Sequence, residues 1–134
     1  MSQEGERQAL SLARLTRSKQ HQKSARDLLR NDDFADSISR SYYAIFQAAR
    51  ALLAREGAES RKHSGVISLF NRLFVKTGKV NKRLGVIVKD ARRSREMADY
   101  TELAEFSRED AEGQFADAEF FIREVERFIV KDNE

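Results

Sequence analysis

An arginine, an aspartate and a tyrosine lie close together at the end of the most basic part of the sequence. Asp99 follows Arg95 by four positions, and Tyr100 comes directly after it. Residues four apart share one face of a helix, so the carboxylate of Asp99 could orient the guanidinium of Arg95 beside Tyr100. Such a group could contact a phosphate or a nucleotide. The alternative interpretation is an ordinary ion pair near a helix end.

Two adjacent tyrosines form a second candidate. Tyr42 falls on an apolar stripe, so we expect its ring in the core and its hydroxyl bonded to a partner. Tyr43 lies one step round the helix, and Arg40, three residues earlier, is on the same polar edge. This edge could face a cleft or a nucleobase, although a half-buried packing role is the simpler interpretation of Tyr43.

His63, which follows Lys62, is a third candidate. Histidine titrates near neutral pH, so His63 could transfer protons. The alternative is a residue at a helix start whose ring hydrogen-bonds locally. The other histidine, His21, lies in a different predicted helix, so we expect no metal site and no cofactor.

Basic and acidic residues are unevenly distributed along the chain. Residues 60–95 contain eleven Lys/Arg and one acidic residue, whereas residues 96–134 contain four Lys/Arg and thirteen Asp/Glu. The basic segment could track RNA phosphates, in binding that weakens steeply with salt. Alternatively, it faces the acidic segment of the same molecule or an acidic partner. Its members are Lys76, Lys79, Lys82, Arg83, Lys89, Arg92 and Arg93.

The composition is that of a single globular domain. The 134 residues are 40% apolar and 35% charged, which favours one domain over residues 1–134. The lack of cysteine excludes disulfides, thiolate catalysis and cysteine zinc sites. No apolar run approaches the roughly 20 residues of a membrane span, and the N-terminus does not resemble a signal peptide. We therefore expect a cytoplasmic protein with no membrane partner.

The absence of proline and the 3.6-residue periodicity predict an all-α bundle of about five helices. The first is expected from Glu6 to Arg30, and the second from the turn at residues 31–33, which supplies an N-cap, to Gly57. Their apolar positions are Ala9, Leu10, Ala13, Ala25, Leu28 and Leu29 in the first, and Phe34, Ile38, Tyr42, Ile45, Ala49 and Leu52 in the second.

Three further helices are expected in the second half of the chain. The third begins at a Ser64 cap and is broken at residues 77–78, and the fourth begins at Asn81. The last opens at Ser107, with Asp110 close to a capping box. Its apolar seam is widened by further phenylalanines, which favours a central position in the bundle or a dimer contact. These positions are Ala111, Phe115, Ala118, Ile122, Val125 and Ile129, with Phe120, Phe121 and Phe128 beside them.

Three ordered blocks of sequence resemble those of the HEPN family, in a subfamily of small prokaryotic proteins. They are SRSYYAIFQAARALL (39–53), KHSGVISLF with FVKTG (62–78), and REMADY (95–100). The resemblance implies an up-and-down helical bundle that commonly dimerises. Many HEPN proteins are encoded beside a minimal nucleotidyltransferase, with which they form toxin–antitoxin pairs.

Active members of this family are metal-independent ribonucleases with an arginine and a histidine separated by four to six residues. The ribose 2′-hydroxyl attacks the adjacent phosphate, the histidine handles protons, and the arginine stabilises developing charge. Here Arg95 is followed at that spacing by Tyr100 instead. Arg14 and His21 have a similar spacing but lie in the first helix, outside the matching block.

The leading interpretation is a homodimeric binding protein that pairs with a nucleotidyltransferase or binds RNA or a nucleotide. An enzyme, a ribonuclease in which Tyr100 or His63 replaces the missing histidine, is the alternative, and an interaction scaffold is a third. Arg95 and Tyr100 are the candidate catalytic residues. The candidate binding residues are Arg40, Tyr43, Lys62, His63, Arg92, Arg93 and Asp99.

Overall fold

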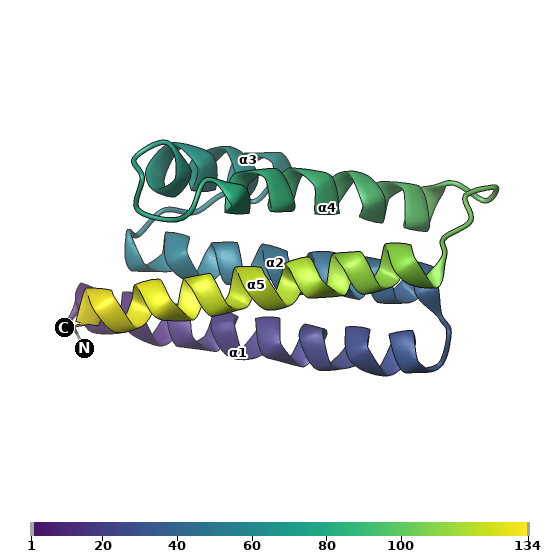
Figure 1. The fold of residues 1–134 in the computed structure, drawn as a ribbon. Coiled ribbons are helices and arrows are strands. Elements are labelled where there is room, and N and C mark those ends of the chain that lie inside the picture. The colour runs from purple at the N-terminus through teal and green to yellow at the C-terminus, as the bar shows by residue number, and fades with distance from the viewer. Residues whose placement is uncertain (1, 134) are drawn as a thin grey trace.

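The computed structural model describes residues 2–133, which form a bundle of five α-helices and confirm the expected all-α class. The four long helices run alongside one another in alternating directions, and α3 packs across one end (Figure 1). None of the helices in the described part of the chain is long and apolar enough to cross a membrane. The elements are α1 (Gln3–Arg30), α2 (Phe34–Arg55), α3 (His63–Phe70), a π-helical turn η1 (Asn71–Val75), α4 (Arg83–Tyr100) and α5 (Arg108–Asn133).

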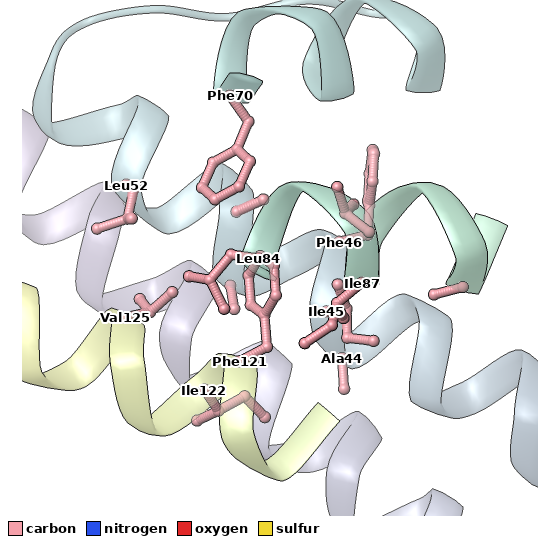
Figure 2. Packing of buried hydrophobic residues seen from close by; sticks show 14 of the residues in the cluster. Ala44, Ile45, Phe46, Leu52, Phe70, Leu84, Ile87, Phe121, Ile122 and Val125 are labelled. Carbon is pink, nitrogen blue, oxygen red and sulfur yellow. The ribbon is translucent and has the colours of Figure 1, made fainter. Parts of the chain in front are cut away.

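Helix α2 is the centre of the bundle, since it packs against α1, α3, α4 and α5. Its predicted stripe is buried as expected apart from Phe34, which is half-buried: Ile45 and Leu52 are fully inaccessible and belong to the same core cluster as Phe121 of α5 (Figure 2). The predicted seam of α5 is also buried, apart from Phe115, which is half-buried. Phe121 lies inside this core, and Phe120 and Phe128 pack against it. Helix α5 therefore contacts α1, α2 and α4.

The first two helices make contact through serines instead of large apolar side chains. The buried hydroxyls of Ser11, Ser18 and Ser37 donate hydrogen bonds to main-chain carbonyl oxygens across the α1–α2 interface, 2.5–2.8 Å away. The expected inner face of α1 was therefore wrong in part, because Ala9, Leu10 and Ala13 are exposed. Small residues let two helices approach closely, and each hydroxyl also satisfies its own hydrogen-bonding need.

The expected capping residues act at two helix N-termini, although α4 begins at Arg83, with Lys82 in the N-cap position, and so later than expected. Asn81 Oδ1 accepts a hydrogen bond from the Arg83 N–H at 2.9 Å. At the start of α5, the N–H of Ser107 donates to Asp110 and the N–H of Asp110 donates to Ser107, at 3.0 and 3.1 Å. This reciprocal pair is a capping box, as expected.

Other boundaries differ from the predictions. Helix α1 begins three residues before Glu6, because the Ser2 hydroxyl caps it by accepting from the Gly5 N–H. Asp33 occupies the N-cap position of α2, yet its side chain makes no capping bond. Ser64 is not a cap, since α3 already begins at His63. The expected third helix also passes into the π-helical turn η1 before it ends.

The acidic α5 is paired mainly with α1 and α2, and much less with the basic segment. Lys19 and Arg55 form ion pairs with Glu126 and Asp132, at 2.6 and 2.7 Å. Within residues 2–133, Arg83 is the basic-segment residue that forms an ion pair with α5, at 3.4 Å. Most of the positive charge on α4 and the segment before it is therefore not neutralised by α5.

The serine-mediated α1–α2 contact predicts how α1 tolerates larger side chains. Replacing Ser18 with Leu should lower the free energy of unfolding by about 1–3 kcal/mol, because the interface has no space for the extra atoms. Ser18→Ala should cost about 1 kcal/mol, the contribution of one hydrogen bond. Thr16→Leu, at an exposed position of the same helix, is the control. Urea unfolding measures all three, and equal stability of Ser18→Leu and the native chain would contradict the close contact.

Candidate functional site

Arg95 of α4 reaches across to α2 and is surrounded by tyrosine rings. Its Nη2 donates a hydrogen bond to the Tyr43 hydroxyl at 2.7 Å. The guanidinium carbon lies 5.8, 5.3 and 5.4 Å from the ring centres of Tyr42, Tyr43 and Tyr100, within the range of cation–π attraction. The predicted grouping of Arg95, Asp99 and Tyr100 therefore exists, and it includes the tyrosine pair of α2.

Asp99 is the acidic partner of Arg95. Its Oδ2 lies 2.9 Å from Arg95 Nε, as expected for an ion pair at positions i and i+4. That contact lacks the geometry of a hydrogen bond, so the buried Nε–H of Arg95 has no hydrogen-bond partner. Although burial opposes the charge, Tyr43, Tyr100 and Asp99 together raise the pKa of Arg95. The site therefore holds a permanent cation among phenols and one carboxylate.

A second hydrogen bond brings a histidine into the same group. The Tyr42 ring is fully buried, and its hydroxyl lies 2.7 Å from Nδ1 of His63 at the start of α3. Burial raises the pKa of Tyr42 to about 12. Burial and the nearby charges of Arg95, Arg92 and Arg50 lower the pKa of His63. At neutral pH the two partners are therefore a protonated phenol and a neutral imidazole.

Tyr43 also faces α1, where it meets a histidine that was not among the predicted site residues. The His21 ring lies 5.7 Å from the Tyr43 ring, and Arg40 Nη1 is 3.3 Å from His21 Nδ1. Burial, Arg40 and Arg17 lower the pKa of His21. These side chains line a groove of about 690 Å³ between α1 and α2. The sequence signal for His21 is its spacing. It lies three positions after Ser18, so the two side chains share the face of α1 that packs on α2.

A second groove lies on the other side of His63 and also has a volume of about 690 Å³. Its lining is basic and aromatic, with Arg50 as a residue that sequence reasoning did not include. Phe46 forms part of its wall and stacks on His63 with ring centres 4.1 Å apart. The lining residues are Phe46, Arg50, Glu59, Ser60, Arg61 and His63.

Three of the candidate binding residues lie outside the hydrogen-bonded cluster. Arg92 forms an ion pair with Glu96 at 3.1 Å, although its charge still acts on His63 and Tyr42. Lys62 and Arg93 are exposed, and no side-chain contact joins them to the cluster within residues 2–133. In the same range no group of three or more acidic or histidine side chains could hold a metal ion. The chemistry available is that of arginine, tyrosine and histidine.

Comparison with known proteins assigns the chain to a family. The HEPN domain family matches residues 12–128, which is most of the sequence. A UPF0332 protein of Thermotoga maritima is 43% identical over 105 residues, covering 78% of this chain and 80% of the relative. The chain therefore belongs to the HEPN family.

Two other relatives carry names that describe a function. Both are proteins of Methanocaldococcus jannaschii named "Putative toxin". One is 34% identical over 106 residues, covering 79% of this chain and 78% of the relative. The other is 31% identical over 110 residues, covering 81% and 75%.

The environment of His63 predicts its titration. Its NMR midpoint should lie below the ordinary value of 6.5, and Arg95→Gln should raise it by removing a nearby positive charge. Because the folded-state pKa is lowered, the contribution of His63 to stability is complete above pH 6.5 and is lost as the pH falls through the lowered value. Arg123→Gln, an exposed position on α5, is the matched control. A midpoint unchanged by Arg95→Gln would contradict the proximity of the two charges.

Proposed function

We propose that this protein is the RNA-binding HEPN component of a toxin–antitoxin-like module and that Arg95 binds an RNA phosphate. The observation that carries the proposal is the incomplete pairing of Arg95. The Tyr43 hydroxyl holds its Nη2, and Asp99 lies beside its buried Nε, which leaves Nη1 without a hydrogen-bond or ion-pair partner among residues 2–133. A fixed guanidinium with spare donors suits a phosphate, which accepts several hydrogen bonds at once.

The surroundings of Arg95 support an anionic ligand. The side chains of Arg40 and Arg92 lie around the Tyr42–Tyr43 pair, and both histidines have pKa values lowered in part by these arginines. The basic segment remains largely unpaired by α5 and adds positive charge along α4. Positive charge of this kind provides most of the sequence-independent affinity for nucleic acid.

The relatives and the family blocks support the biological setting. The proteins named as toxins align with most of this chain, and the family resemblance implies a minimal nucleotidyltransferase as partner. We extend the proposal to a homodimer that pairs with such an enzyme in the cytoplasm. The alternative of an interaction scaffold without an RNA role gives no reason for the incomplete pairing of Arg95.

Loss of the Arg95 guanidinium should weaken RNA binding. In fluorescence anisotropy with a single-stranded RNA, Arg95→Gln should raise the Kd about tenfold or more, because a charged hydrogen bond to phosphate is lost. Replacing Arg92 and Arg93 with Glu should weaken binding and reduce its salt dependence. Arg123→Gln on α5 makes the same change of charge away from the cluster and serves as control. Equal binding by the native chain and Arg95→Gln rejects the phosphate site.

A second candidate function is metal-independent RNA cleavage. It is favoured by the position of His63, which comes from α3 and shares the tyrosine cluster with Arg95. The imidazole would take the 2′-hydroxyl proton as the oxygen attacks phosphorus, and would then protonate the departing 5′-oxygen. Arg95 would stabilise the charge on the phosphoryl oxygens.

The cleavage hypothesis gives a different result for two substitutions. If cleavage occurs in the presence of a chelator, His63→Gln should slow it about 100-fold or more, since general acid–base catalysis contributes at least that much. Tyr100→Phe should have a small effect, because the Tyr100 side chain is mainly exposed and His63 handles the protons. Gel analysis of a labelled RNA, with a search for the 2′,3′-cyclic phosphate end, measures both. Cleavage that survives His63→Gln but not Tyr100→Phe would reverse these roles.

A further inference from the structure

The groove beside His63 has the chemistry of a nucleotide subsite. Phe46 and Arg50 of α2 form one wall, and the segment before α3, residues 59–61, forms the other. We propose that this groove binds one unpaired nucleotide of single-stranded RNA, with the base stacked on His63 and the phosphate held by Arg50 and Arg61. This inference rests on the proposed RNA-binding function and identifies the class of RNA and a second point of contact.

The aromatic part of the subsite is already rigid. His63 lies nearly parallel to Phe46, with 14° between the ring planes and 4.1 Å between ring centres. Its Nδ1 edge is fixed by the Tyr42 hydroxyl. One ring face is therefore covered by Phe46 and one edge is held, while His63 still lines the groove. Tyr43 lies edge-on to the same ring, with ring centres 6.2 Å apart. A base that stacked on the part of the His63 ring lining the groove would extend the existing stack, and this kind of contact accepts any base.

The cationic part of the subsite has more positive than negative charge. Glu59 Oε1 lies 2.5 Å from Arg14 Nη2 and 3.8 Å from Arg50 Nη2, so it chiefly satisfies Arg14. Among residues 2–133, the other hydrogen bond of the Arg50 side chain is a long one of 3.4 Å to Gln47. Arg14 lies close by, since its Nη1 donates a hydrogen bond to the Arg50 main-chain oxygen at 3.1 Å, and burial and the Arg14 charge lower the pKa of Arg50. Arg61 is exposed on the groove and adds a third.

Glu59 occupies the place where a phosphate would compete. Its carboxylate is 62% exposed and lies between two guanidinium groups at the groove. A phosphate that approaches Arg50 is repelled by this carboxylate. Removal of the Glu59 charge should therefore strengthen RNA binding, an effect that a purely structural ion pair would not produce.

The subsite lies next to the Arg95 cluster. Tyr42 connects the two, since its hydroxyl contacts His63 while its ring lies under the Arg95 guanidinium. An RNA strand that crosses His63 would thus present one phosphate to Arg50 and a neighbouring phosphate to Arg95. The two contacts share a ligand but use different residues, so they can be separated by substitution.

The test is equilibrium binding of a 2′-O-methyl oligouridine, which cannot be cleaved through a 2′-hydroxyl, and of an abasic oligonucleotide of the same length. The native chain should bind the abasic strand about tenfold more weakly, because stacking is lost. His63→Ala should bind the oligouridine about tenfold more weakly and no longer distinguish it from the abasic strand. His63→Phe, which keeps an aromatic face, should still distinguish them. Arg61→Ser should weaken binding, and Glu59→Gln should strengthen it several-fold.

The outcomes separate this inference from the proposed function. If Arg95→Gln weakens binding while His63→Ala and Arg61→Ser bind like the native chain, the groove is not a nucleotide subsite and the proposed function stands. If the native chain binds no oligouridine, both are wrong. Equal affinity for free uridine monophosphate would show a mononucleotide site and overturn the RNA assignment. Arg61 is exposed, so its variant reports on binding even if His63→Ala impairs folding.

Discussion

The arrangement of the site depends on the buried hydroxyl of Tyr42. Its ring belongs to the apolar stripe of α2 and is fully buried in the core, so the phenol cannot obtain a hydrogen bond from water. A buried hydroxyl without a partner costs about 1–3 kcal/mol. His63 meets that need, which fixes the start of α3 against the middle of α2. The same ring supports the Arg95 guanidinium from α4. One packing residue therefore positions an imidazole and a guanidinium that come from different helices.

The distribution of charge follows from how the helices pair. Helix α5 is rich in acidic residues, and its Glu126 and Asp132 pair with Lys19 of α1 and Arg55 of α2. Apart from Arg83, which pairs with α5, the basic segment forms no ion pair with the acidic helix in residues 2–133. Pairing within the same molecule therefore accounts for little of the basic charge, whereas binding of RNA and binding of an acidic partner both stay predictions. Lys89, Arg92 and Arg93 of this segment lie on α4, the helix that also carries Arg95.

Local features were predictable from the sequence, whereas contacts between helices were not. The pairing of Arg95 with Asp99 lies within one helix turn, so spacing alone predicted it. The helical class and the buried stripe of α2 follow from periodicity for the same reason. In contrast, Tyr42 and His63 are 21 positions apart, and Tyr43 and Arg95 are 52 apart. No periodicity connects such residues. The inner face of α1 was mispredicted because hydropathy does not identify a serine that packs by hydrogen bonding to a carbonyl group.

The hydrogen bond between Tyr42 and His63 also bears on the choice between binding and cleavage. With a pKa raised to about 12, the Tyr42 phenol stays protonated, so its O–H finds its hydrogen-bond acceptor when Nδ1 of His63 is unprotonated. A neutral His63 then carries its own proton on Nε2, so it can donate to a phosphate but cannot accept a proton there. The other tautomer would make Tyr42 an acceptor and leave its buried O–H without this partner, at a cost of about 1–3 kcal/mol. General-base catalysis by Nε2 requires that tautomer, whereas phosphate binding and base stacking do not. The resting hydrogen bond therefore supports the proposed RNA binding over the proposed cleavage.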